Sequence, residues 1–384
     1  MNYTLMNKNT PILTCEMDDI FSIFTKIVEF HNPEYLPIGV GSPSSEYFKK
    51  KLNVWFMSRS IPASRDGLTD ALMAMDISNS NELLTKSLGL SLSDQYWINP
   101  GGELSWDEIN FFTNPFSEDV GDILLGKFSE SSEGIDFKSP DNTSDGVLKK
   151  RWKIINGERV LVKGGTDVYK QQPINEVLVS ILLKRLDIHH VQYKLLIEDE
   201  EPYSLCKNFI TPDTELVSAW QIYNSFDKKS NNDSHYTHFM KAVESLGIEG
   251  MTEYLNSLLS IDYIVANTDR HYGNFGVIRD VNTLQFVGTA PIYDTGTSLW
   301  HDVETTRIRA SRDVKSRPFR DWHSRQIEYV TSFDRVDLGK LSGFEEQAHK
   351  VLEQFEHIGS ERRDVLARGV QKRINNLQKI IDDL

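Results

Sequence analysis

Hydrophobic and polar positions change their spacing near the middle of the chain, and this change predicts a run of distinct elements. Residues 148–155 and 159–164 are two short β-type runs on either side of Asn156 and Gly157. Asn-Gly between two such runs is a strong signal for a β-hairpin. Residues 172–188 then carry apolar side chains at helical spacing. This part of the chain therefore predicts a hairpin followed by a helix.

The spacing of hydrophobic positions also predicts the elements toward the C-terminus. Two further strands are predicted, and from about residue 215 onward the pattern is mainly helical. A polar loop interrupts the helices, and a strand-like run that ends in a glycine-containing loop follows it. The predicted strands cover 191–198, 202–210 and 284–298, and the predicted helices cover 250–267, 343–358 and 360–383.

The first third of the chain lacks such regular spacing. Short helices at 67–77 and 81–90 alternate with irregular segments, and large aromatic side chains are expected to fix these segments by burial. These aromatic residues are Trp55, Trp97, Trp106, Phe111 and Phe112.

A polar stretch rich in Gly, Ser and Pro, residues 126–146, is expected to be a linker that ends in a loop. The predicted units are therefore 1–135, 136–213 and 214–384.

Composition narrows the class of protein. The chain has 384 residues, 39% apolar and 26% charged, with a net charge of −14, which argues against a broad footprint on nucleic acid. It contains no apolar run long enough to cross a membrane and no secretory signal pattern. Its two cysteines, Cys15 and Cys206, are far apart. A disulfide framework or structural zinc site is not expected, and a cytoplasmic location fits.

The polar loop carries the candidate chemistry in the string DRHYGNFG. Asp269 and Asn274 are five positions apart, the spacing at which kinases place a catalytic Asp and a metal-binding Asn. Asp294, in YDTG, follows an apolar run and precedes a glycine-containing turn, where a second metal-holding carboxylate is needed. Mg²⁺ prefers oxygen ligands, so Asn274 and Asp294 are chemically suitable.

Upstream residues supply candidates for the nucleotide. Lys163 ends a predicted strand and Glu176 lies on the next helix, the arrangement that contacts α- and β-phosphates in kinases. The segment 139–152 precedes that strand and has the position of a phosphate-covering loop, although Gly146 is its only glycine. Each residue alone has an ordinary structural explanation. All of them together, in the required order, favour phosphoryl transfer.

The strings NTDRHYGNFG and YD, the Asn-Glu pair on the helix and the atypical loop resemble the HipA-like serine/threonine kinases of bacteria over residues 139–384. The resemblance implies an α+β, protein-kinase-like fold with a small β-rich lobe, a larger helical lobe and an additional N-terminal lobe. It also implies ATP and Mg²⁺ as cofactors.

The resemblance implies a role for each candidate. Asp269 would be catalytic, His271 would lie near the transferred phosphate, and Asn274 and Asp294 would hold Mg²⁺. The remaining candidates would contact ATP, with the segment 207–209 meeting adenine through its backbone. This nucleotide-binding set is Ser144, Gly146, Lys163, Glu176, Lys207 and Phe209.

HipA-like proteins are usually toxins partnered by a small helix-turn-helix antitoxin. Some phosphorylate a protein of translation such as an aminoacyl-tRNA synthetase, and some phosphorylate a serine of their own phosphate loop. Here Thr143 and Ser144 occupy that loop. We expect either a mobile loop that is itself modified or a solvated linker whose hydroxyls cap turns. No membrane and no direct nucleic-acid partner is expected.

Three other functions stay open. Phosphoinositide-type kinases share the DRHxxN order, but an acidic chain without a basic amphipathic helix does not favour a lipid substrate. Small-molecule phosphotransferases of the aminoglycoside type carry a His where this chain has Asn267. A non-enzymatic nucleotide-binding or repressor-binding regulator is opposed by the intact set of candidate residues.

Overall fold

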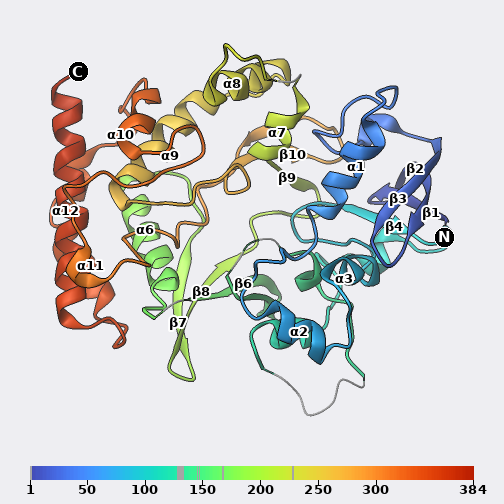
Figure 1. Ribbon diagram of the computed structural model, residues 1–384, viewed down its shortest axis with the longest axis horizontal. Coiled ribbons are helices and arrows are strands. Elements are labelled where there is room, and N and C mark those ends of the chain that lie inside the picture. The colour runs from blue at the N-terminus through green and yellow to red at the C-terminus, as the bar shows by residue number, and fades with distance from the viewer. Residues whose placement is uncertain (1, 128–133, 145, 147, 167, 227–228) are drawn as a thin grey trace.

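The computed structural model describes residues 2–127, 134–144, 146, 148–166, 168–226 and 229–384. Within these residues the protein is a mixed α+β chain with three antiparallel sheets (Figure 1). The first sheet lies in the N-terminal part, at the right of Figure 1, and the long C-terminal helices lie at the left. The α+β class predicted from the sequence is therefore confirmed. Part of the predicted linker, residues 128–133, lies outside the described residues.

The N-terminal part contains a four-stranded sheet that the sequence did not predict. Its strand order is β3-β2-β1-β4. Three consecutive positions of β1, Leu5 to Asn7, are all buried, so the strand lacks the alternation by which strands are recognised. The strands are β1 (Asn2–Asn7), β2 (Thr10–Asp18), β3 (Ile23–Phe30) and β4 (Tyr96–Asn99).

Short helices surround this sheet, and those predicted at 67–77 and 81–90 are present as α2 and α3. All five aromatic residues expected to be buried are buried, as predicted. The helices are η1 (Pro33–Tyr35), α1 (Phe48–Met57), α2 (Leu68–Ala74), α3 (Ser80–Lys86), α4 (Trp106–Ile109), α5 (Asp119–Leu124) and η2 (Pro140–Thr143).

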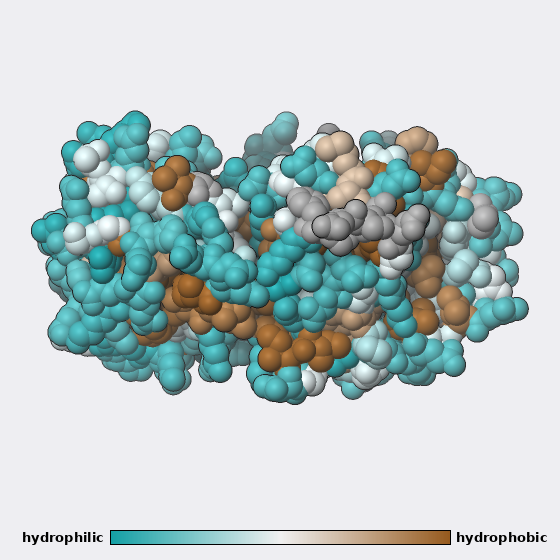
Figure 2. All heavy atoms as spheres, turned by 90° about the horizontal axis from the view of Figure 1, so that it is seen from below, coloured by the Kyte–Doolittle hydropathy of each residue, from teal (hydrophilic) through white to brown (hydrophobic). Residues whose placement is uncertain are grey.

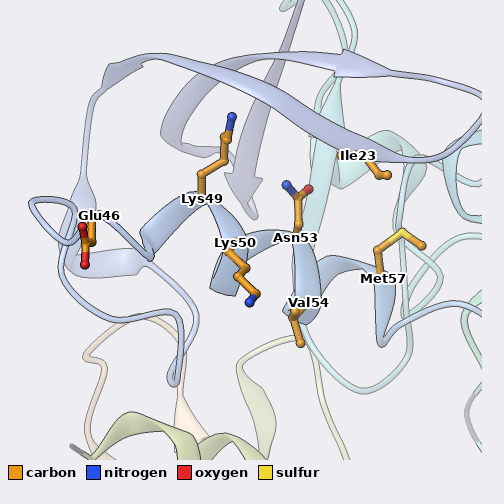
Figure 3. A pocket seen from close by; sticks show the side chains of 7 residues that line it. All are labelled: Ile23, Glu46, Lys49, Lys50, Asn53, Val54 and Met57. Atoms are coloured by element: carbon orange, nitrogen blue, oxygen red, sulfur yellow. The ribbon is translucent and has the colours of Figure 1, made fainter. Parts of the chain in front are cut away.

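The surface of the N-terminal part has a hollow beside α1 (Figure 3). Lys49 is held there, because its Nζ donates a hydrogen bond to Thr25 O at 2.9 Å. A second hollow lies between the last two helices of the chain. Neither hollow includes a predicted site residue, so the candidate site lies elsewhere. The first is lined by Ile23, Glu46, Lys49, Lys50, Asn53, Val54 and Met57.

The second sheet, β5-β6-β8-β7, contains the predicted hairpin. Asn156 and Gly157 both have positive φ, +52° and +80°, as the tight hairpin turn requires. Helix α6, which was also predicted, packs against β7 and β8. The elements are β5 (Lys150–Ile155), β6 (Glu158–Gly164), α6 (Gln172–Leu186), β7 (Tyr193–Glu198) and β8 (Glu201–Lys207).

The third sheet, β11-β10-β9, adds short strands to a part of the chain that is otherwise mainly helical after residue 215, as predicted. The polar loop is followed directly by β10. The predicted strand at 284–298 is shorter than expected, because β11 ends at Thr289 and only Ile292 continues as an isolated bridge to His190. The strands are β9 (Thr214–Ser218), β10 (Gly276–Asp280) and β11 (Phe286–Thr289).

The C-terminal part is built around the buried helix α9. Leu258, Ile261 and Ile264 on this helix are fully buried, and α12 packs across it. The three helices predicted from 250 onward are present as α9, α11 and α12. The helices here are α7 (Ala219–Ser225), α8 (His235–Ser245), α9 (Met251–Val265), η3 (Thr305–Arg307), α10 (His323–Gln326), η4 (Ile327–Tyr329), η5 (Leu338–Leu341), α11 (Phe344–Leu352) and α12 (Ser360–Asp382).

The N-terminal part is packed onto the segment that connects β8 to β9. Gln95 Nε2 donates to the carbonyl oxygens of Thr211 and Thr214 at 2.9 and 2.7 Å. Asn208 Nδ2 donates to Leu92 O at 2.9 Å. An apolar cluster that includes Trp97 joins the two sides. The first third of the chain therefore supports the segment on which nucleotide binding was predicted.

The face shown in Figure 2 is mostly hydrophilic, with small separate hydrophobic areas. None of the helices in the described part of the chain has both the length and the apolar character that a membrane crossing requires.

Candidate functional site

Lys163 lies at the centre of the candidate site, between two carboxylates. It comes from the end of β6 and is 4% exposed. Its Nζ forms ion pairs with Glu176 of α6 and with Asp294 Oδ1, the latter at 2.5 Å. Ser204 of β8 donates a hydrogen bond to the other oxygen of Glu176. Residues 163, 176 and 294 were predicted to belong to one site, and the fold brings them into contact.

The carboxyl groups of Glu176 and Asp294 both contact the Lys163 ammonium group, but their pKa values are shifted in opposite directions. Burial alone would raise the pKa of the Asp294 carboxyl. The positive charges of Lys163, Lys150 and Arg270 lower this pKa by more than burial raises it, so the pKa lies well below the usual range. For Glu176 burial dominates the attraction of Lys163, and its pKa is raised. The pKa of Lys163 is raised above its usual range, because Asp294 and Glu176 together outweigh burial. Asp294 is therefore the carboxylate held ionised.

Lys150 is a site residue that the sequence analysis missed. It lies directly opposite Lys163 in the β5–β6 register and is 8% exposed. Its charge helps lower the pKa of Asp294. The signal was present, because a two-residue turn at Asn156-Gly157 fixes the register and side chains opposite each other share a face. Counting back from the turn pairs residue 150 with residue 163.

A buried arginine joins the polar loop to the Asp294 loop. Arg270 is fully buried, and its Nε and Nη2 donate to the Asp262 carboxylate of α9 at 2.8 and 3.0 Å. Its Nη1 donates to Asn274 O and to Tyr293 O, both at 2.7 Å. One guanidinium therefore fixes the backbone beside both proposed metal ligands. The sequence analysis assigned no role to Arg270 or Asp262.

The polar loop itself forms a tight turn after α9. His271 N–H donates to Asp269 O at 2.8 Å, and Asn274 N–H donates to His271 O at 2.9 Å. The ring nitrogen Nδ1 of His271 accepts from Gly273 N–H at 3.0 Å. The Asp269 carboxylate is 38% exposed and pairs with Arg317 at 2.9 Å. Asp269 thus faces the surface, while Asn274 faces the loop interior.

The loop after Asp294 is held by helix α6. Asp294 has a left-handed backbone, φ +55°, and its N–H donates to Tyr193 Oη at 3.2 Å. Asn175, next to Glu176, donates from Nδ2 to Gly296 O and Ser298 O at 2.8 and 2.7 Å. The adjacent Asn-Glu pair thereby binds the loop with one side chain and Lys163 with the other.

The segment Ser139–Ser144 is buried, which corrects the expectation of a solvated linker, while a phosphate loop that is itself modified stays a prediction. It begins with the short helix η2, and its side chains are buried. Ser144 Oγ donates to Asp141 O at 2.8 Å and accepts from Arg65 Nη1 at 2.8 Å. Arg65 also donates to Ser144 O and, at 3.0 Å, to Gly146 O. Arg65, a residue of the N-terminal part, thus covers the segment, and no local sequence pattern predicts this contact. Asp145 lies outside the described residues.

Gly146 and Asp141 show how tightly this segment is packed. Gly146 has φ +96°, and a Cβ there would lie 2.5 Å from Lys150 Nζ. Burial raises the pKa of the Asp141 carboxyl to about 7, although a hydrogen bond from Trp152 N–H opposes the change. The segment therefore ends directly beside Lys150, which lies opposite Lys163 in the hairpin.

The segment 207–209 is only partly directed at the site. The Lys207 side chain is 68% exposed and pairs with Glu158 at 3.0 Å, because it lies on the opposite face of β8 from Ser204. The Phe209 ring lies 5.5 Å from the Tyr293 ring, centroid to centroid. The side chain of Phe209 thus adjoins the Asp294 loop, and that of Lys207 does not.

The donor set fits a magnesium ion bound together with phosphates. The Nδ2 of Asn274 donates to Asp269 O at 3.2 Å, and no described residue donates to its Oδ1. Lys163 binds Oδ1 of Asp294, and no described residue donates to Oδ2. No group of three or more His, Cys, Asp or Glu among the described residues is arranged to hold a metal. Mg²⁺ is usually held by one or two carboxylates plus substrate phosphates, so two oxygen donors suffice.

A known protein family matches the part of the chain that contains the candidate site. The model of the HipA-like C-terminal domain matches residues 142–361, more than half of the chain. The chain belongs to the HipA-like family. The resemblance predicted from the motifs is therefore confirmed.

Individual relatives of this HipA-like chain are distant. The serine/threonine-protein kinase CtkA of Helicobacter pylori is 28% identical over 100 residues, which are 25% of this chain and 30% of CtkA. The HipA of the Shewanella oneidensis toxin–antitoxin system, solved with HipB and its operator DNA, matches with a TM-score of 0.55 and 12% identity. That match covers 98% of this chain and 97% of the other, and it shows the fold alone.

Proposed function

We propose that this HipA-like protein is an ATP-dependent serine/threonine protein kinase. Residues 136–213 form the small lobe, residues 214–384 form the large lobe, and residues 1–135 form an accessory lobe. The observation that carries the proposal is the position of Lys163 between Glu176 and Asp294. In addition, Arg270 donates hydrogen bonds to the carbonyl oxygens of Asn274 and of Tyr293, the residue before Asp294. This is the charge arrangement that phosphoryl transfer needs.

The nucleotide is proposed to lie between β5–β6 and the Asp294 loop. Lys163 and Lys150 face the phosphates, and Glu176 orients Lys163. The segment ending at Gly146 covers the phosphates with its backbone. The backbone at 207–209 meets adenine, and only the Phe209 side chain is directed toward the site. These groups bind and orient ATP.

Transfer is proposed to occur at Asp269. The substrate hydroxyl oxygen bonds to the γ-phosphorus while the bond from that phosphorus to the β–γ bridging oxygen breaks, and ADP leaves. Asp269 orients the hydroxyl and accepts its proton, and its exposure leaves room for a protein substrate. His271, two residues on, faces the transferred group. Asn274 and Asp294 would hold Mg²⁺, which when bound neutralises charge on the phosphoryl oxygens.

Replacing Asp294 with asparagine is expected to weaken binding of Mg·ATP by at least roughly tenfold. Binding of metal-free ATP should change much less, because the lost charge matters chiefly to the cation. Isothermal titration calorimetry with and without Mg²⁺ measures both. The exposed Asp302→Asn, which removes the same charge nearby, is the control. Equal Mg·ATP affinity in Asp294→Asn and the parent would rule out this metal assignment.

Arg65→Gln is expected to raise the KM for ATP several-fold with little change in kcat. Arg65 is 3% exposed and is bound to Ser144 and Gly146, so its loss frees the segment that covers the phosphates. Arg65→Lys keeps the charge and should restore part of the affinity. If instead kcat and KM keep their parental values while only the melting temperature falls, Arg65 is structural and has no role in positioning ATP.

Two further parts of the proposal concern self-modification and partners. Ser144 is a candidate for self-phosphorylation, but its hydroxyl must first leave Arg65 and Asp141 O. We also propose that the chain is a toxin with a small helix-turn-helix antitoxin, since HipA with this fold was solved with HipB. Its substrate is then a protein of translation.

The non-enzymatic alternative is tested by turnover. The parent protein with Mg²⁺ should hydrolyse ATP or phosphorylate itself or a serine peptide, and mass spectrometry identifies the modified residue. Complete absence of turnover, with ATP still bound, would support a nucleotide-binding regulator.

A further inference from the structure

A strongly basic surface adjoins the candidate site, in contrast to the net charge of −14 for the whole chain. Residues 307–325, the basic segment, contain seven Lys or Arg side chains and two Asp. Figure 1 draws this segment in orange, where it runs into the start of α10 near α9. All seven basic side chains are exposed: Arg307, Arg309, Arg312, Lys315, Arg317, Arg320 and Arg325.

The basic segment has a fixed backbone beneath these exposed side chains. Ile308, Phe319 and His323 are buried in it. Gln326 Oε1 accepts hydrogen bonds from the N–H groups of Phe319 and Arg320 at 3.0 and 3.1 Å. The cationic groups therefore stand on a preformed surface, which limits the ordering cost of binding a partner.

Two contacts place the basic segment beside the polar loop. Arg317 Nη1 pairs with Asp269 Oδ1 at 2.9 Å, and His323 Nε2 donates to Asn267 O at 2.9 Å. Burial lowers the pKa of His323 to about 4, with Arg373 adding to the effect, so this contact uses the neutral ring. The basic surface thus begins at the residue proposed to meet the acceptor hydroxyl.

Most of these cations have no carboxylate partner among the residues that the structure describes. Arg317 pairs with Asp269, and Arg325 pairs with Glu328 at 2.9 Å. Among the described residues no ion pair is formed by Arg307, Arg309, Arg312, Lys315 or Arg320. The Arg317–Asp269 pair is itself exposed, and exposed pairs are weak, so an incoming carboxylate can replace Asp269 on Arg317.

We propose that the basic segment is the docking surface for an acceptor polypeptide with acidic residues beside its serine or threonine. The proposal rests on the kinase function and adds its substrate class. Arg317 binds the carboxylate nearest the hydroxyl, which releases Asp269 to accept the hydroxyl proton. Arg312 and Lys315 bind carboxylates further along the peptide. A long nucleic acid fits less well, because it would extend from this short segment onto an otherwise acidic chain.

The first measurement is binding by fluorescence anisotropy, which does not depend on turnover. The probes are a labelled serine peptide flanked by Asp and Glu and the same peptide with Asn and Gln in their place. The parent should bind the acidic peptide at least roughly tenfold more tightly, and added salt should reduce the difference. The double variant Arg312→Glu/Lys315→Glu should lose this preference.

The matched control is Lys372→Glu/Lys379→Glu, which makes the same charge change at exposed positions of α12. It should keep the parental preference. Equal affinity of the parent for both peptides, or equal loss in both double variants, would overturn the proposal. So would tighter binding of a single-stranded RNA oligonucleotide that depends on Arg312 and Lys315.

The second measurement is transfer of phosphate from Mg·ATP to the same two peptides. A lower KM for the acidic peptide, lost in Arg312→Glu/Lys315→Glu, supports the proposal. Transfer to both peptides with one KM rejects the substrate class and leaves the kinase function standing. Absence of transfer to any hydroxyl, even where binding discriminates, rejects the kinase function and the acceptor role with it.

Discussion

Asp269→Asn is expected to reduce phosphoryl transfer by roughly 10²–10⁴-fold, the usual contribution of a positioned base. The asparagine keeps the shape of the side chain but cannot accept the hydroxyl proton. Affinity for Mg·ATP should stay close to that of the parent, because among the described ion pairs the Asp269 carboxylate joins Arg317, whereas Lys163 joins Glu176 and Asp294. Single-turnover transfer to the neutral serine peptide and calorimetry with Mg·ATP measure the two effects separately.

The control for this variant is Arg317→Gln, which removes the same ion pair from its other side. With the neutral peptide it should keep most of the turnover. If Arg317→Gln loses as much as Asp269→Asn, the ion pair rather than the carboxylate is responsible. Unchanged turnover in Asp269→Asn removes Asp269 from the mechanism.

Arg270→Met is expected to lower the free energy of unfolding by about 3–5 kcal/mol, the cost of breaking a buried ion pair. Asp262, 1% exposed, would keep a buried charge without its cation, and Asn274 O and Tyr293 O would lose a donor. Urea denaturation measures the change. Adding Asp262→Asn should recover part of it, because the unpaired charge is then removed.

Arg325→Met is the matched control, since Arg325 forms an exposed ion pair with Glu328. Its effect should not exceed about 1 kcal/mol. Similar urea midpoints for Arg270→Met and Arg325→Met would contradict the view that Arg270 joins the two loops. If Arg270→Met folds, its Mg·ATP affinity should also fall, because the backbones of Asn274 and Tyr293 lose their common partner.

The hairpin β5–β6 and helix α6 were determined by the sequence. Asn156 and Gly157 between two β-type runs specify a tight turn, and the turn fixes which residues face each other across it. That rule places Lys150 opposite Lys163, although only Lys163 was identified beforehand. The order of Lys163, Glu176, Asp269, Asn274 and Asp294 also identified the family, because spacing along the chain is a property of the sequence itself.

Only the tertiary structure decided which distant residues support the site. Arg65 reaches Ser144 from 79 positions away, and Arg317 reaches Asp269 from 48 positions away. Neither pairing follows from a local period or turn, so the segment before the hairpin was expected to be exposed and is in fact buried. The N-terminal sheet was missed because β4 and the end of β1 are buried at consecutive positions and β3 is mostly exposed, so these strands lack the alternation that marks a strand. Local periodicity and turn chemistry act between near neighbours, whereas burial of a polar segment depends on which part of the chain folds over it.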